Sequence, residues 1–398
     1  MGIYSALGQK RTMFACGVAV LAAFLFVTTP CLVHQPVHYV SNHVEDLFND
    51  GAIPDFVTRT GIKWLLQERL NEQLHKNVTE RQNDKMMFVD GLKVSPVAIE
   101  TEAANVQHYE VDSRFYHAVL GKHLKYSSSL FDDVHAPVPE ASALLDDAEE
   151  RMLALYAHRA RLDVNGSLRI LDLGCGWGSV SLYVAESFPR HQIVAVSNSA
   201  TQKTWIEAQA TQRGLHNIRV CTGNIVSWSP LDHGEAPFDR IISIEMLEHM
   251  KNYKTIFSRI ARWLNANGLF FAHIFVHRES PYHFEVRTPR DWMAKYFFSG
   301  GTMPSVDLFH YFTDDLTLLS QWHVSGMHYS LTAEAWLQNM DRQSDRIRSI
   351  LSDAYGNDAT TMWYNRWRAF FMACSELFKL NGGSEYFVAH YLFGPKCN

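Results

Sequence analysis

The sequence lacks the features that mark several broad classes of protein. Its 22 glycines and 13 prolines among 398 residues are too few for a collagen-like chain. Acidic residues outnumber basic ones by 42 to 36, so the net charge is -6 and there is no basic footprint for nucleic acid. The six cysteines include no CxxC pair, which argues against a zinc ribbon and a disulfide framework. With 47% hydrophobic residues, the chain is expected to be globular and to bind no nucleic acid.

The N-terminus departs from this ordinary composition. Residues 13–33 contain no charge and directly follow Lys10 and Arg11. A run of this length can span a bilayer, so residues 1–40 are expected to form a single-pass membrane anchor. A cleaved signal or an organelle-targeting segment is the alternative, although residues 28–31 make a poor cleavage site. The basic pair predicts that the following domain crosses the membrane, but its side stays open.

The rest of the chain changes character near residue 160. Helical, amphipathic stretches dominate residues 41–160. Short apolar strands alternating with helices follow, and the strands are expected at residues 168–173, 192–196, 218–221, 238–244 and 269–275. This alternation predicts an α/β fold with a doubly wound, Rossmann-like sheet in residues 161–398. Residues 278–330 are rich in aromatic side chains, so we expect a substrate lid inserted there.

A glycine loop joins the first strand to a helix. Gly174, Gly176 and Gly178 allow a sharp turn and close approach of a ligand to the backbone. The dinucleotide fingerprint needs a glycine where Ser179 stands, and no Walker A lysine is present. With Asp172 two residues before the first glycine, the loop has the form typical of methyltransferases that use S-adenosylmethionine. We therefore expect S-adenosylmethionine as the cofactor.

The ends of the second and third strands offer further cofactor ligands. Asn198 and Gln202 stand where an acidic ribose ligand is usual, and their amides can bind hydroxyl groups. A helix cap at this Asn-Ser sequence is an equally compatible interpretation. After the third strand, Asn224 can accept a hydrogen bond from the adenine amine while Ile225 packs on the ring.

Three titratable residues follow the fourth strand. Glu245, Glu248 and His249 have the spacing of one helix face, at the sheet edge where ligands bind. Acidic residues also favour helix starts for electrostatic reasons alone. One histidine is too few for the metalloprotease motifs, so no metal is expected. We predict that His249 removes a proton from an amine and that both carboxylates hold its ammonium form.

The chain resembles the cyclopropane-fatty-acid-synthase-like branch of S-adenosylmethionine-dependent methyltransferases, and within it the plant coclaurine N-methyltransferases. The similarity covers roughly residues 48–395. It is carried by residues 50–55, 101–111, 120–127, 242–246 and 296–305. The resemblance implies a class I methyltransferase fold in which the helices of residues 41–160 cover the cofactor.

The resemblance also implies roles for individual residues. The implied cofactor site comprises Tyr126, Ser127, Gly174, Asn198, Gln202, Asn224, Ile225 and Ile244. Asn224 departs from the aspartate that is usual in the family. Glu245, Glu248 and His249 match the residues that bind substrate and act in catalysis in the coclaurine enzymes.

The lipid-modifying branch differs by holding a bicarbonate base between a cysteine, a glutamate, a histidine and a tyrosine. Ser128 replaces that cysteine here, while Glu248, His273 and Tyr329 occupy the other positions. This incomplete site favours N-methylation over cyclopropanation. Trp367 and Phe371 are expected to add a wall to the substrate pocket that His273 and Tyr329 also line.

The sequence therefore predicts an S-adenosylmethionine-dependent N-methyltransferase for a small aromatic or alkaloid-like amine. One alternative is methyl transfer or cyclopropane synthesis on unsaturated acyl chains of membrane lipids. Another is an inactive module tethered to a membrane. The identity of the amine, the number of methyl groups added and the oligomeric state are not predicted. Cys374 is expected to be a small buried apolar residue.

Overall fold

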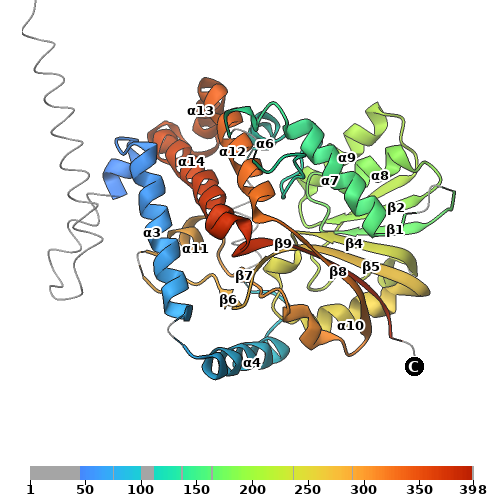
Figure 1. Cartoon of the computed structure of the whole chain (residues 1–398). Coiled ribbons are helices and arrows are strands. Elements are labelled where there is room, and N and C mark those ends of the chain that lie inside the picture. Colours follow the sequence, from blue (N-terminus) through green and yellow to red (C-terminus); the bar gives the residue numbers. More distant parts are fainter. Residues whose placement is uncertain are drawn as a thin grey trace, which may run out of the picture.

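The computed structural model describes residues 45–74, 76–99, 112–135, 138–162, 165–235, 237–288 and 290–396 (Figure 1). The predicted anchor at residues 1–40 and the family-like stretch at residues 101–111 lie outside these ranges. No helix within the described ranges is both long and apolar enough to cross a membrane.

A seven-stranded sheet forms the centre of the fold, in the order β3-β2-β1-β4-β5-β9-β8. Its strands are β1 (Arg169–Leu173), β2 (Gln192–Ser197), β3 (Ile218–Thr222), β4 (Phe238–Ile244), β5 (Leu264–His277), β8 (Leu316–Val324) and β9 (Tyr386–Pro395). Neighbouring strands among the first five are parallel, whereas β9 runs antiparallel to both β5 and β8. The predicted doubly wound α/β sheet is therefore confirmed, and β8 and β9 extend it.

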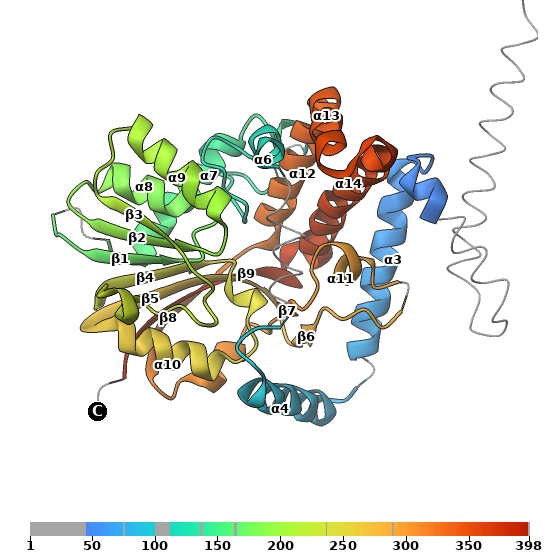
Figure 2. The ribbon, with the colours of Figure 1, turned by 180° about the vertical axis from the view of Figure 1, so that it is seen from behind.

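Alternating side chains explain why helices cover both faces of this sheet. Ile170 packs in the core that contains α7 (Leu145–Arg159), whereas its neighbour Leu171 packs in the core that contains α10 (Tyr253–Trp263). The helices α8 (Ser179–Ser187) and α9 (Ala200–Gln212) follow β1 and β2. Figures 1 and 2 show α7, α8 and α9 on one face of the sheet and α10 on the other.

A layer of helices lies across the carboxyl ends of the parallel strands (Figures 1 and 2). It consists of α3 (Asp55–Leu74), α6 (Ser113–Val119), α12 (Gly326–Arg342), α13 (Ser344–Tyr355) and α14 (Asn357–Lys379). Another helix, α4 (Val78–Val94), packs beside α10. The carboxyl edge of the sheet, where ligands of such folds bind, is thereby enclosed.

The aromatic region at residues 278–330 divides into two parts. Its first part carries β6 (Tyr282–His283), α11 (Trp292–Tyr296) and β7 (Thr302–Met303), and covers the strand ends. Its second part contains β8, which is an edge strand of the central sheet. Trp322 of β8 therefore belongs to the sheet rather than to a lid.

Candidate active site

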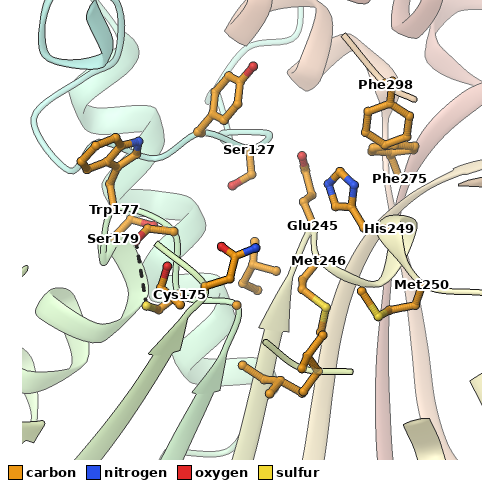
Figure 3. Close-up of a pocket in the computed structure, with 18 of the residues that line it drawn as sticks. Ser127, Cys175, Trp177, Ser179, Glu245, Met246, His249, Met250, Phe275 and Phe298 are labelled. Atoms are coloured by element: carbon orange, nitrogen blue, oxygen red, sulfur yellow. Dashed lines mark hydrogen bonds between the residues drawn. The ribbon is translucent and has the colours of Figure 1, made fainter. Parts of the chain in front are cut away.

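A cavity opens at the carboxyl ends of β1, β2, β4 and β5 (Figure 3). Polar and glycine residues of the strand ends line one side of it. The other side is apolar, and its members are Phe275, Phe284, Met293, Phe298, Met303, Phe370 and Phe378. Figure 3 shows Glu245 and His249 between these two regions, with Ser127 and Trp177 on the far side from Phe275 and Phe298.

The glycine loop is needed for backbone conformation and for close packing. Gly174 has a φ of 85°, and a Cβ added there would lie 2.5 Å from Cγ of Met246. Gly178 has a φ of 82° and begins α8, where an added Cβ would meet the Ile206 side chain at 2.7 Å. Gly174 and Gly176 line the cavity, whereas Gly178 is absent from its lining. Gly178 therefore supports the conformation of the loop without lining the cavity.

Gln202 presents a free donor to the cavity. Its Oε1 accepts a hydrogen bond from the Ser197 hydroxyl at 2.6 Å. Its Nε2 is buried and has no hydrogen-bond partner among the described residues. Asn198 lines the same part of the cavity, and Ser199 caps α9 by accepting from the Gln202 N–H at 3.3 Å. The helix cap and a cavity-facing amide thus coexist, as the sequence allowed.

The remaining predicted cofactor residues also line the cavity. They are Tyr126, Ser127, Asn224, Ile225 and Ile244. Asn224 is held by its Oδ1, which accepts from the Val226 N–H at 3.0 Å. Sequence reasoning missed Leu124, Trp177, Ser179 and Met246, which line the cavity as well. Trp177 lies within the glycine loop and Ser179 directly follows it, so the motif itself could have predicted that both residues line the cavity.

Glu245 lies at the end of β4 with a strained backbone and a buried carboxylate. Its φ is 47°, a left-handed value that non-glycine residues rarely adopt. Oε1 accepts from the Ser128 N–H and the His273 ring, each at 3.0 Å, and Oε2 accepts from the Tyr329 hydroxyl at 2.6 Å. Burial raises the pKa of Glu245 to about 6 despite these donors. The carboxylate is therefore charged above that pH.

Glu248 has a different environment. The segment Leu247–His249 is a 3-10 turn and α10 begins only at Tyr253, so the expected helix starting near Glu245 is absent. Glu248 is fully buried outside the cavity lining, and its Oε1 accepts from the Phe275 N–H at 3.0 Å. Burial raises its pKa well above the usual value. Because of this 3-10 turn, the side chains of Glu245 and His249 both line the cavity, whereas the side chain of Glu248 is buried in the core.

Ser128, His273 and Tyr329 converge on Glu245 and not on Glu248. The expected grouping with Glu248 is therefore not seen in the structure. A carboxylate of the chain itself already accepts the hydrogen bonds of all three residues. This arrangement follows from the strained turn, which the sequence spacing did not reveal.

His249 lies at the cavity in its neutral form. Its ring packs 5.0 Å from that of Phe298. Burial lowers its pKa to about 4, with Glu245 raising it and Lys251 lowering it further. An unprotonated imidazole at neutral pH can accept a proton from a bound molecule.

The predicted substrate wall is only partly at the cavity. Tyr329 lines it, whereas His273 lies behind Glu245, outside the lining. Trp367 and Phe371 are fully buried in the core around α14, and Phe370 and Cys374 of the same helix line the cavity instead. Burial raises the pKa of the Cys374 thiol, which keeps it protonated. The wall does come from α14, through Phe370 and Cys374 and not through Trp367 or Phe371.

Comparisons with known proteins agree with this architecture. The family model for mycolic acid cyclopropane synthetase matches residues 98–384. The (S)-coclaurine N-methyltransferase of Papaver somniferum is 34% identical over 349 residues, covering 87% of this chain and 96% of that protein. Pavine N-methyltransferase of Thalictrum flavum subsp. glaucum is 30% identical, over 87% of this chain and 94% of that protein.

Solved structures give the same picture. A coclaurine N-methyltransferase bound to N-methylheliamine and SAH superposes with a TM-score of 0.82 at 30% identity, covering 89% of this chain and 99% of that chain. The cyclopropane synthase MmaA2 of Mycobacterium tuberculosis shares the fold, with a TM-score of 0.61 at 18% identity over 76% of this chain and all of that chain. The chain therefore belongs to the mycolic acid cyclopropane synthetase family of class I methyltransferases, on the side of that family that includes the coclaurine N-methyltransferases.

Proposed function

We propose that this protein is an S-adenosylmethionine-dependent N-methyltransferase acting on a small aromatic or alkaloid-like amine. The observation that carries the proposal is the pair formed by ionisable Glu245 and neutral His249 beside an aromatic cavity wall. The relatives named as coclaurine and pavine N-methyltransferases support it. The assignment of individual residues below is part of the proposal.

The glycine side of the cavity fits the cofactor. The Gly176 backbone borders open space in the cavity, with no atom within 4 Å of where a Cβ would lie, and the buried Nε2 of Gln202 is a donor without a protein acceptor among the described residues. Gly174, Gly176, Asn198, Gln202, Asn224 and Ile225 would hold the nucleoside part, with Tyr126, Ser127 and Ile244 closing over it. When bound, S-adenosylmethionine supplies the methyl group.

Glu245 would bind the substrate ammonium through its negative charge, because a buried carboxylate attracts a cation strongly. The amine can attack only after losing a proton, and neutral His249 would accept it at an imidazole nitrogen. With its proton held on His249, the amine nitrogen would be free to accept the methyl group that bound S-adenosylmethionine would supply. Glu248 would act indirectly, because its raised pKa keeps it neutral behind Phe275.

The position of the Glu245 carboxylate also favours amine methylation over lipid modification. The carboxylate oxygens already accept hydrogen bonds from Ser128, His273 and Tyr329, so these donors are not available to a separate bicarbonate. Methyl transfer to lipid acyl chains is therefore the second candidate. The division into residues 1–40, 41–160 and 161–398, with an anchor in the first, remains a prediction.

Transfer of labelled methyl groups tests the function. The protein is incubated with methyl-labelled S-adenosylmethionine and, separately, with a panel of tetrahydroisoquinoline and phenethylamine amines or with vesicles of unsaturated phospholipid. Label in the amines supports the proposal, and label only in the lipid overturns it. If calorimetry detects no binding of the cofactor, the inactive-module alternative is correct instead.

A further inference from the structure

A row of side chains that includes two buried histidines runs across three strands behind the active site. His273 of β5 is paired with His390 of β9, which is paired with Trp322 of β8. Paired residues of neighbouring strands project from the same sheet face. Ile244 of β4 is the partner of His273 on the other side and directly precedes Glu245. The row therefore leads from the edge of the sheet to the Glu245 carboxylate.

The hydrogen bonds along this row run in one direction. Arg159, at the end of α7, has its Nη1 2.6 Å from Nδ1 of His390. A guanidinium can only donate, so Nδ1 accepts and the proton of neutral His390 is on Nε2. That Nε2 lies 2.9 Å from Nδ1 of His273, which must accept in turn. His273 then carries its proton on Nε2 and donates to Oε1 of Glu245.

Both histidines are neutral, because burial lowers their pKa values well below the usual one. Neither side chain is exposed to solvent, so no water competes for their nitrogens. Each ring therefore has one donor and one acceptor nitrogen, and the tautomer of one ring fixes that of the next.

A second set of donors supports the same tautomer of His273. The Tyr156 hydroxyl also lies 2.9 Å from Nδ1 of His273, and burial raises the Tyr156 pKa well above its usual value, so the hydroxyl keeps its proton. Nδ1 has a single lone pair, which Tyr156 and His390 share as donors, and it therefore carries no proton of its own. Nearby, the buried ammonium of Lys125 donates to the Ser127 hydroxyl at 2.6 Å. The positive charge of Lys125 also lowers the pKa of Glu245.

We propose that Arg159 and His390, which lie outside the cavity lining, are positioning residues that hold His273 in its Nε2–H tautomer and thereby keep Glu245 ionised for the substrate ammonium. The inference rests on the proposed function for its catalytic consequence. The Arg159 guanidinium has no carboxylate partner in the described part of the chain and stacks 5.0 Å from the Trp322 ring. No described acidic side chain therefore pairs with the Arg159 charge, and the guanidinium donates its hydrogen bond to His390.

Removing the Arg159 donor should make Glu245 easier to protonate. The titratable groups that act on Glu245 are Lys125, Tyr156, Glu248, His249, His273, Tyr329 and Cys374. Arg159 contacts neither oxygen of Glu245, so its effect reaches that carboxylate through the donor nitrogen of His273, and loss of a donor to the ionised form raises a carboxyl pKa. The acidic limb of kcat/KM, expected near pH 6 in the unmodified protein, therefore moves to higher pH.

The first test measures pH profiles of amine methylation. Arg159→Met should move the acidic limb upward by about one pH unit, so that activity at pH 6 falls roughly fivefold while kcat at pH 9 and cofactor affinity are retained. Arg159→Lys keeps a charged donor and should restore the profile. Arg240→Met is the matched control, because among the described residues this half-buried arginine donates only to the backbone carbonyls of Ala160, Arg161 and Asp239.

The second test needs no substrate and so separates this inference from the proposed function. Nitrogen NMR of the full chain, labelled with ¹⁵N in histidine, should show Nε2–H tautomers for His273 and His390, and Arg159→Met should change the His390 signals. If Arg159→Met does not fold, His390→Leu removes the same donor to His273 with an apolar side chain of similar size. An unmoved acidic limb, or unchanged tautomers in these variants, would overturn the proposal.

Discussion

At the scale of single residues, Glu245 combines two features that each cost free energy. A left-handed φ at a non-glycine residue costs about 1–3 kcal/mol, and an ionised carboxylate is costly to bury. Three hydrogen-bond donors offset the burial, and the strain aims the carboxylate at the cavity. Glycine would adopt this backbone more easily, but it could not supply the charge. Strain of this kind is common at functional sites, where the surrounding structure holds it in place.

His249 provides the sharpest prediction at this scale. His249→Ala should lower kcat for amine methylation by about 100-fold or more, because general-base catalysis contributes roughly that much. The affinity for S-adenosylmethionine, measured by calorimetry, should change little, since the predicted cofactor ligands are other residues. His216→Ala is the control, because His216 is exposed and outside the cavity lining. Unchanged turnover in His249→Ala would remove it as the base.

At the scale of elements, the segment from β6 to β7 forms the apolar cover of the site. Phe298 links it to the strand ends, because its ring lies 5.0 Å from His249, 5.7 Å from Phe275 and 4.8 Å from Phe284. Gly301 must be a glycine for this packing, since an added Cβ would lie 2.1 Å from the Phe298 ring. The glycine therefore allows the Phe298 ring to pack over the cavity.

Phe298→Ala tests the importance of this cover. Losing a half-buried phenylalanine from an aromatic wall should raise KM for the amine about tenfold, because about 1.5–3 kcal/mol accompanies full burial of such a side chain, as a bound amine would complete it. Cofactor affinity should stay within about twofold. Phe56→Ala, at an exposed position on α3, is the control and should leave both constants unchanged. Equal KM values for Phe298→Ala and the unmodified protein would show that the substrate binds elsewhere.

At the scale of the whole molecule, an ion-pair cluster attaches α3 to the helices that enclose the site. Arg59 of α3 donates to Glu334 of α12 at 2.6 Å and to Glu376 of α14 at 3.0 Å. Both glutamates are buried, and the Ser375 hydroxyl also donates to Glu334 at 2.6 Å. A residue near the start of the described chain thus holds together two carboxylates from its C-terminal third.

Removing Arg59 should therefore destabilise the fold more than an ordinary surface substitution. Arg59→Met leaves two buried carboxylates without their main counter-charge, and the free energy of unfolding should fall by about 3 kcal/mol. Lys63→Met is a matched control on the same helix. Lys63 is 58% exposed and lies 3.4 Å from Glu376, so its loss should cost less than about 1 kcal/mol. Urea unfolding of the three proteins measures both values, and equal losses would contradict the assignment.

Most of the sheet could be predicted because its signals are local. Each parallel strand is a short apolar run beside a helix, and the glycine loop stands between β1 and α8. Strand β9 could not be anticipated in the same way, because its place between β5 and β8 depends on pairing across more than a hundred residues. Strand β8 was not anticipated for the same reason, because it pairs with β9, and its Trp322 was expected to belong to the lid.

By itself, the sequence determined the doubly wound fold, the methyltransferase loop and the presence of two acids and a histidine after β4. Only the tertiary structure decided which acid faces the cavity. The spacing i, i+3, i+4 places side chains on one face only in a helix, and here a left-handed residue and a 3-10 turn separate Glu245 from Glu248. Tertiary packing also brought Arg159 and His390 behind Glu245, because strands far apart in sequence become neighbours only once the sheet has formed.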